Sequence, residues 1–235
     1  MKGPDPVKIE HMFDSIAADY DRLNHFMSLG IDRCWRRRAL KQIVTPERPQ
    51  TILDVACGTG DFSILIAEAA HPDSKIYAAD LSEGMLEVMH QKLMGKCLDG
   101  QIKPVRCNCE QLPFADVSFD RVTIAFGIRN FEHRETALKE FMRVLKPGGK
   151  LVVLELSVPS NRLLRWCYNI YFKHIIPLIG GLVSGDKAAY RYLPASVLKF
   201  PGPAEWTATM GSCGYRAVTH KAFTFGLCRM YTGTK

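Results

Sequence analysis

The chain has 235 residues, 47% of them hydrophobic, and a formal net charge of +7. This length and hydrophobic content predict one domain spanning residues 1–235, and the positive charge allows an anionic partner such as a lipid surface. No apolar run reaches the roughly 20 residues of a membrane span, and the start lacks the core of a signal peptide, so we expect a cytoplasmic protein.

Two amphipathic helices are expected within residues 1–50, before the first strand. Lys8–Asp21 has an apolar stripe at helical spacing. It either packs on the edge of a sheet or covers a ligand and brings Tyr20 close to it. Asp32–Lys41 places basic residues around Trp35, which indicates either a solvated helix face or a face that meets anionic lipid headgroups. We interpret residues 1–50 as a helical lid.

The segment TILDVACGTGD, residues 51–61, predicts a buried strand followed by a glycine turn. Asp61–Ala70 then shows helical spacing of apolar residues. A strand, a glycine turn and a helix form the nucleotide-binding arrangement of α/β sheets. Gly58 and Gly60 match the first two glycines of a dinucleotide fingerprint, but Ser63 stands at the third position.

The second strand, Lys75–Asp80, ends on an acidic residue. Asp80 can accept hydrogen bonds from both ribose hydroxyls of an adenosine. Because the cradle for a pyrophosphate is weak, S-adenosylmethionine fits this pattern better than a nicotinamide dinucleotide: it has a ribose and an adenine but no phosphate.

The alternation of strands and helices continues along the chain and predicts an α/β, Rossmann-like, mostly parallel sheet with ligands at the carboxyl ends of its strands. The last two expected strands suit an antiparallel hairpin at the sheet edge. The further expected elements are a helix at Ser82–Met94, strands at Ile102–Cys107 and Phe119–Phe126, a helix at Arg134–Leu145, a strand at Lys150–Leu156, a helix at Ala204–Cys213, and strands at Arg216–His220 and Phe223–Thr232.

Polar side chains follow the third and fourth strands, where a ligand is expected. Asn108 carries an amide suited to adenine edges, although turns also favour this residue. Gly127 permits a close ligand approach, and Arg129 and Asn130 place polar groups over the site. The alternative for Arg129 is a surface salt bridge.

Residues 157–200 form an insertion before the last strands. Asn161–Gly185 is rich in aromatic and branched aliphatic residues. This indicates either an apolar lid or interfacial element that accepts a lipid tail, or ordinary helical packing. Tyr190 and Tyr192, which follow in Lys187–Pro194, are candidates for lining a ring pocket.

The eight cysteines show neither a C-x-x-C pair nor a histidine at zinc spacing. Free thiols in a reducing cytosol are therefore expected, with no metal site. No module that interleaves aromatic and basic residues is visible, so no nucleic-acid partner is expected.

Six stretches together resemble one family over nearly the whole chain. They are FDSIAADYDRLNHFMSLGIDRCWR, LDVACGTGD, NCEQLPFADVSFDRVTIAFGIRNF, FMRVLKPGGKLVVLE, GDKAAYRYLPASVLKFP and FTFGL. The chain resembles the class I, seven-stranded S-adenosylmethionine-dependent methyltransferases, and within them the UbiE/MenG family of menaquinone and ubiquinone C-methyltransferases. AFGIRNF and AAYRYLPASVLKFP single out the family, whereas LDVACGTGD indicates only the superfamily.

The resemblance implies the ligands and the residues that bind them. It places S-adenosylmethionine against Thr59, Asp80, Asn108 and Cys109. At Ala125, where the family often has Ser, a hydroxyl contact is lost, and at most backbone and packing contacts with the cofactor are implied. The implied acceptor is a demethylated prenyl quinol, with demethylmenaquinol favoured and a demethylated benzoquinol as the alternative. A bacterial enzyme peripheral to the inner face of the cytoplasmic membrane, and a homodimer, are further expectations.

The expected reaction is displacement of a methyl group from a sulfonium by a ring carbon. That carbon becomes nucleophilic when the neighbouring hydroxyl loses its proton, so the reduced quinol is required. Arg129 is the candidate for removing this proton through a water or for stabilising the phenolate, with Asn130 and Tyr20 orienting the ring. Three rivals stay open: a methyltransferase for RNA or protein, a nicotinamide-dependent oxidoreductase, and a non-catalytic cofactor-binding subunit.

Overall fold

The computed structural model describes residues 3–170 and 187–235, apart from the side chains of residues 167, 169 and 187–191. Its centre is a seven-stranded sheet with the strand order β3-β2-β1-β4-β5-β7-β6. Neighbouring strands are parallel except that β7 runs antiparallel to both β5 and β6, so the expected sheet and C-terminal hairpin are confirmed. The strands are β1 (Thr51–Val55), β2 (Lys75–Asp80), β3 (Ile102–Arg106), β4 (Phe119–Ala125), β5 (Leu145–Leu156), β6 (Arg216–Phe223) and β7 (Cys228–Thr234).

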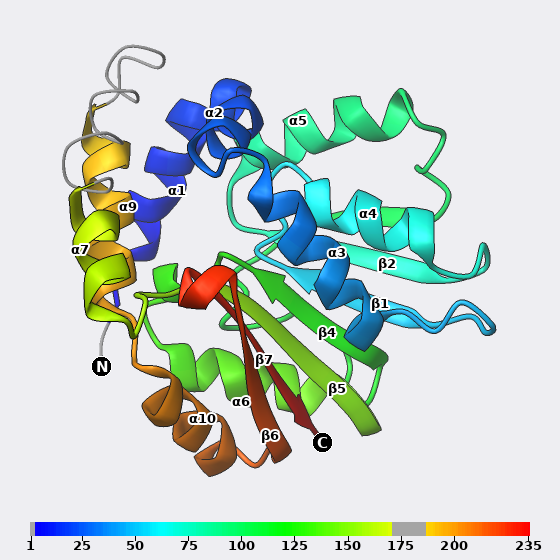
Figure 1. Ribbon diagram of the computed structural model, residues 1–235. Coiled ribbons are helices and arrows are strands. Elements are labelled where there is room, and N and C mark those ends of the chain that lie inside the picture. Colours follow the sequence, from blue (N-terminus) through cyan, green and yellow to red (C-terminus); the bar gives the residue numbers. More distant parts are fainter. Residues whose placement is uncertain (1–2, 171–186) are drawn as a thin grey trace.

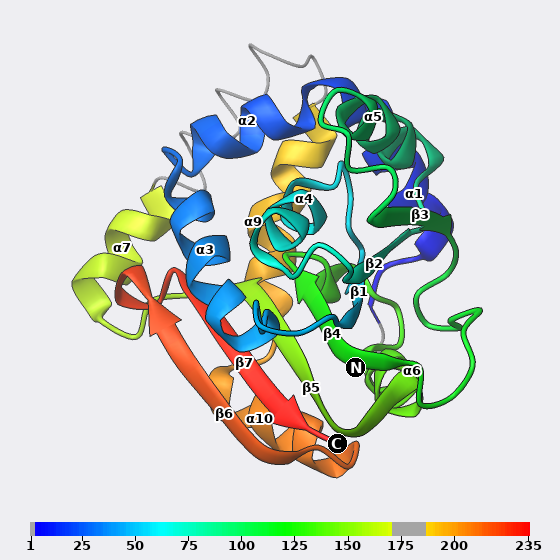
Figure 2. The same ribbon diagram turned by 90° about the vertical axis from the view of Figure 1, so that its right-hand side faces the viewer.

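Helices cover both faces of the sheet (Figures 1 and 2). One core packs α3 (Ile31–Ile43), α4 (Asp61–Ala69) and α5 (Glu83–Met94) against one face, and the other packs α6 (Arg134–Val144) and α10 (Pro203–Ser212) against the opposite face. Successive strand residues divide between the two cores because side chains alternate along a strand: Ile52 belongs to the first and Leu53 to the second.

Several element boundaries differ from those expected. β5 begins at Leu145 rather than Lys150, because Leu145 already pairs with Phe119 across the sheet. The last strand begins at Cys228 rather than Phe223, since a short 3-10 turn, η4 (Thr224–Gly226), separates it from β6. The φ angles of Thr224, Phe225 and Gly226 are all positive, at 44°, 56° and 93°, which ends the extended strand.

The first expected helix is divided into three pieces. These are α1 (Pro6–Ile16), the 3-10 turn η1 (Ala17–Asp19) and α2 (Tyr20–Met27). Together with α7 (Arg162–Ile170) and α9 (Lys187–Lys199), they lie beyond the carboxyl ends of the central strands (Figure 1).

Polar contacts tie this helical layer to the sheet domain. The Asp14 carboxylate of α1 accepts hydrogen bonds from the Ser82 hydroxyl and from the Gly84 backbone N–H at 3.0 Å. Ser82 also caps α5, because its Oγ accepts the Met85 N–H at 3.1 Å. No helix in the described parts of the chain has the length and apolar character needed to cross a bilayer.

Candidate active site

The glycine turn after β1 has the conformation that its sequence predicts. Gly58 and Gly60 have φ angles of +56° and +82°, which few other residues adopt without strain. A Cβ added to Gly60 would lie 2.6 Å from Cγ of Met89, so this glycine lets α5 pack closely. A Cβ added to Gly58 would have no neighbour closer than a ring carbon of Tyr20 at 3.9 Å. Gly58 therefore borders open space that a ligand can use.

Asp80 lies at the end of β2, directly beside this turn. Its Oδ2 accepts the Gly58 N–H at 2.7 Å, and its Oδ1 accepts the Ser82 N–H at 2.9 Å. Burial raises the pKa of Asp80, although these backbone donors pull it back down. The carboxylate is thus held in one orientation, with oxygens that still have lone pairs for further donors.

A small cavity of about 90 Å³ opens over these residues. Five of the seven expected cofactor-binding residues line it: Gly58, Asp80, Asn108, Cys109 and Ala125. Thr59 and Gly60 do not line it. The Thr59 side chain is buried and its hydroxyl donates instead to Asp21 of α2, which the sequence pattern did not indicate.

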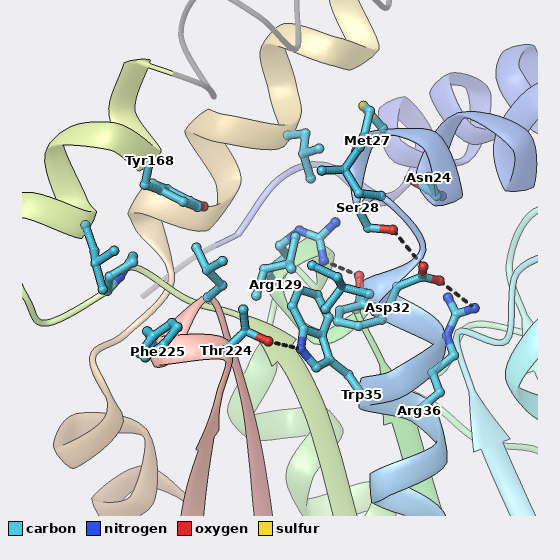
Figure 3. A pocket seen from close by; sticks show the side chains of 18 of the residues that line it. Asn24, Met27, Ser28, Asp32, Trp35, Arg36, Arg129, Tyr168, Thr224 and Phe225 are labelled. Carbon is cyan, nitrogen blue, oxygen red and sulfur yellow. Dashed lines mark hydrogen bonds and ion pairs between the residues drawn. The ribbon is translucent and has the colours of Figure 1, made fainter.

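A second cavity of about 370 Å³ adjoins the first (Figure 3). Most of its lining is apolar and comes from α2, α3, α7, α9, η4 and the ends of β4 and β5. The apolar residues include Met27, Ile31, Trp35, Leu156, Leu164, Leu193 and Leu227. Tyr20 and Phe126 line both cavities, so they mark where the two meet. Arg129 lines the large cavity and Asn130 the small one.

Arg129 is fixed by a partner that sequence reasoning missed. Nη1 of Arg129 lies 2.7 Å from Oε1 of Glu155, whose side chain is completely buried. The same Nη1 donates a hydrogen bond to the Phe126 carbonyl. Burial lowers the pKa of the Arg129 guanidinium, but the Glu155 charge outweighs this and leaves the pKa raised. Arg129 is therefore a permanent cation at the wall of the large cavity, and not the surface residue of the alternative interpretation. An acidic residue at the end of the apolar run LVVLEL was the available signal for Glu155.

Helix α9 supports the neighbouring Asn130. The Tyr192 hydroxyl donates to Oδ1 of Asn130 at 2.9 Å, and Ser196 of the same helix accepts from Nε of Arg129 at 3.3 Å. Tyr192 lines neither of the two cavities, but it borders a smaller hollow of about 40 Å³ together with Tyr20 and Arg129. The side chain of Tyr190 lies outside the described residues.

Trp35 does not face lipid headgroups from a basic helix surface. It is 5% exposed, lines the large cavity, and donates from Nε1 to Oγ1 of Thr224 at 2.8 Å. Arg36 forms an ion pair inside the protein, because its Nη1 lies 3.2 Å from Oδ2 of Asp61. Only Arg33, Arg37, Arg38 and Lys41 remain exposed among the basic residues of α3.

The fold is that of solved SAM-dependent methyltransferases. A crystal structure of a SAM-dependent methyltransferase from Aquifex aeolicus superimposes with a TM-score of 0.60 over 85% of this chain and 88% of the other, at 18% identity. At that identity the likeness establishes the fold alone.

The chain belongs to the ubiE/COQ5 methyltransferase family, whose model matches residues 1–235. It is 45% identical over 233 residues to the demethylmenaquinone methyltransferase of Bacteroides fragilis, covering 99% of this chain and 94% of that protein. It is 47% identical over 228 residues to the ubiquinone/menaquinone biosynthesis C-methyltransferase UbiE of Geobacter sulfurreducens, covering 97% of this chain and 88% of that one.

Proposed function

We propose that this protein transfers the methyl group of S-adenosylmethionine to a ring carbon of a prenylated quinol, converting demethylmenaquinol to menaquinol. The observation that carries the proposal is the junction of a polar cavity with a larger apolar one at Tyr20 and Phe126. The polar adenosine part of the cofactor and the apolar quinol ring would come into contact at this junction. The names of the curated relatives support the same substrate class.

The small cavity suits the adenosine part of this cofactor. Asp80 presents a fixed carboxylate to the two ribose hydroxyls, Asn108 offers an amide to the adenine, and Gly58 leaves room beside the turn. Thr59 contributes through the backbone turn and through its bond to Asp21 rather than by lining the cavity.

When bound, S-adenosylmethionine supplies an electrophilic methyl group on a sulfonium. Alignment of the acceptor carbon with it is the main task of the protein, because orientation contributes about 7–11 kcal/mol whereas a positioned base contributes about 10²–10⁴-fold. Tyr20 and Phe126 hold the ring at the junction, and Asn130, fixed by Tyr192, orients it from the cofactor side. The apolar lining excludes water.

Arg129 stabilises the phenolate form of the acceptor, whose hydroxyl proton passes to solvent. After methyl transfer the ring carbon releases its own proton to solvent, which restores aromaticity. The raised pKa of Arg129 excludes a role as proton acceptor at neutral pH, so the deprotonation half of the sequence-based hypothesis is dropped. A fixed cation beside an anion that develops in a water-poor cavity strongly stabilises the transition state. Oxidised quinone has no hydroxyl to ionise and is not a substrate on this account.

A prenylated acceptor resides in a membrane, so we also propose that the protein contacts an anionic membrane surface peripherally. The homodimer stays a prediction, as do the residue roles given above.

Labelled S-adenosylmethionine tests the reaction when it is incubated with demethylmenaquinol, oxidised demethylmenaquinone or a demethylated benzoquinol. We expect label in the reduced naphthoquinol ring and none in the oxidised form. Faster labelling of the benzoquinol would favour ubiquinone biosynthesis instead, and labelling of RNA or protein alone would overturn the proposal.

Arg129 is tested best together with its partner. Arg129→Ala alone would leave Glu155 buried and unpaired, at a cost of about 3–5 kcal/mol, and could simply unfold the chain. In the double variant Arg129→Gln with Glu155→Gln we expect single-turnover transfer to fall by about 10²–10³-fold, with cofactor affinity nearly unchanged. A normal rate would remove Arg129 from the mechanism.

A further inference from the structure

Large apolar side chains stand exposed around the mouth of the large cavity. Leu29, Ile31 and Phe225 line this cavity and are nevertheless 77%, 36% and 81% exposed. Leu29 lies between α2 and α3, Ile31 begins α3, and Phe225 lies in η4, which is far away in the sequence but lines the same cavity. Figure 3 shows Phe225 at one side of the cavity, opposite the α2 residues.

Helix α7 continues this apolar surface. Leu163, Trp166 and Ile170, at positions i, i+3 and i+7, are 69%, 62% and 39% exposed, so they form one apolar face turned to solvent. Leu164 and Tyr168 of the same helix face the cavity. Figures 1 and 2 both show α7 beside η4. We call these six exposed residues, Leu29, Ile31, Leu163, Trp166, Ile170 and Phe225, the apolar rim.

The backbone at two rim positions is in an unfavourable conformation. Leu29 and Phe225 have φ angles of +51° and +56°, in the left-handed region that bulky residues avoid. Each such residue carries a conformational cost. Exposure of the same side chains to water is a second cost. Both turns leave these side chains exposed, where an apolar phase could receive them.

The charges near the rim suit an anionic surface. Arg162 and Arg165 are exposed on α7, next to its apolar face. Arg38 is also exposed and stands over the ring of Phe223, 5.6 Å from its centroid, at the end of the strand that leads into η4. Aromatic and aliphatic side chains on one face of a helix with arginines beside them are typical of helices that lie in a membrane interface.

We propose that the apolar rim inserts into the acyl region of an anionic bilayer, so that the large cavity opens directly onto the membrane. This rests on the proposed function, because the rim surrounds the cavity assigned to the lipid acceptor. A prenyl quinol would then reach Arg129 from the bilayer without crossing water. On this proposal the docking surface is the rim, which includes α7 of the insertion, rather than the basic face of α3.

Trp166 provides an intrinsic probe for this proposal. The chain has three tryptophans, and Trp35 and Trp206 are only 5% and 1% exposed. Vesicles of phosphatidylglycerol and phosphatidylcholine should shift Trp166 emission to shorter wavelength and protect it from acrylamide. Trp166→Phe should lose the shift and still float with the vesicles.

The double variant Leu163→Ser with Trp166→Ser tests the surface itself, because both residues belong to the apolar rim and neither lines the large cavity. We expect its partition onto these vesicles to fall about tenfold or more. Its rate on demethylmenaquinol embedded in vesicles should fall in parallel, whereas its rate on a water-soluble, short-chain demethylated naphthoquinol should match that of the wild type. Met94→Ser is the matched control, because Met94 is 68% exposed at the end of α5 and does not line the cavity.

The outcomes separate the two proposals. Unchanged vesicle binding in the double variant would overturn the rim proposal while leaving the methyl transfer intact. If the wild type methylates neither quinol, the proposed function fails instead, whatever the vesicles show. If Trp166 resists acrylamide without vesicles, the chain itself or a second copy covers the rim; sedimentation would then distinguish these cases, and the bilayer proposal would fall.

Discussion

Asp54 and Asp80 are acidic residues of adjacent strands with different partners. Asp80 borders the small cavity and is held by backbone N–H groups. Asp54 is 1% exposed within β1, and its Oδ2 accepts the Ser63 hydroxyl at 2.6 Å. Burial raises the pKa of Asp54 to about 7, although the Ser63 bond lowers it. Ser63, which interrupts the dinucleotide fingerprint, is therefore a structural partner of Asp54.

The carboxylate of Asp80 should dominate affinity for the cofactor. Asp80→Asn keeps the shape but loses the charge and one acceptor for the ribose hydroxyls. We expect affinity for S-adenosylhomocysteine, measured by calorimetry, to fall by about 10- to 100-fold. Glu83→Gln is the control, since Glu83 is exposed at the start of α5 and pairs with Arg106. Equal losses in both variants would contradict the role of Asp80.

Asp54 should make stability depend on pH in an identifiable window. The unfolded chain releases this proton near pH 4 and the folded chain near pH 7, so the folded state binds more protons between these values. The contribution of Asp54 to the free energy of unfolding therefore falls as pH rises through this window. The side chain of Asp54→Asn cannot titrate. The free energy of unfolding of this variant, relative to that of the wild type, should therefore rise by up to about 4 kcal/mol between pH 4 and pH 8. Urea unfolding at both pH values measures this gain, and a constant difference would contradict it.

Some site residues could be read from the sequence and others could not. Gly58 and Asp80 stand at fixed points of a strand–turn–helix pattern, and the structure brings them together as expected. Glu155 and Phe126 come from the ends of β5 and β4, and their roles depend on which strands are neighbours. Sequence spacing carries no information on such contacts between distant segments.

At the scale of elements, an ion network connects the N-terminal helices to the cofactor side of the sheet. Lys92 of α5 pairs with Asp21 of α2 and, at 2.7 Å, with Oδ1 of Asp61 in α4. Asp21 in turn accepts the Thr59 hydroxyl of the glycine turn. His25 of α2 lies 3.1 Å from Oδ2 of Asp61. The position of α2 over the site is thus coupled to the turn that would hold the cofactor.

Removal of Lys92 should loosen this layer. In Lys92→Ala, Asp21 and Asp61 lose their shared cation, so we expect faster amide hydrogen exchange in α2 and cofactor affinity several-fold weaker. Lys96→Ala is a matched control. Lys96 lies just past the end of α5 and pairs with exposed Glu68 at 2.8 Å. Such surface pairs contribute about 0–1 kcal/mol. Similar exchange in both variants would show that the network does not hold α2 in place.

The lengths of elements were harder to predict than their order. Apolar patterns located the strands of the sheet, most of which carry buried side chains, although β6 is largely exposed. The turn at Thr224–Gly226 was missed, since two of its three positive φ values fall on Thr and Phe, which give no turn signal, and Gly226 stands alone. The division of the first helix was also missed, because its apolar stripe continues past Ile16 and the sequence shows no break there.

At the scale of the whole molecule, the sheet presents two adjoining cavities beyond the carboxyl ends of its strands. The glycine turn and β2 build the polar one, and α2, α3, α7 and η4 build the apolar one. Tyr20 and Phe126 belong to both. The parallel sheet and its cofactor edge could be predicted from the sequence, whereas the apolar cavity depends on how four distant segments pack together.

Single-turnover methyl transfer by Leu164→Trp tests this division of the site most directly. Leu164 lines only the larger of the two cavities, and a tryptophan there would occupy space assigned to the acceptor. We predict that transfer to a short-chain demethylated naphthoquinol falls at least about tenfold, with affinity for S-adenosylhomocysteine unchanged. Leu163→Trp, on the exposed face of α7, should leave both unchanged. Undiminished transfer by Leu164→Trp, or a loss of cofactor affinity in its place, would contradict the assignment of the two cavities.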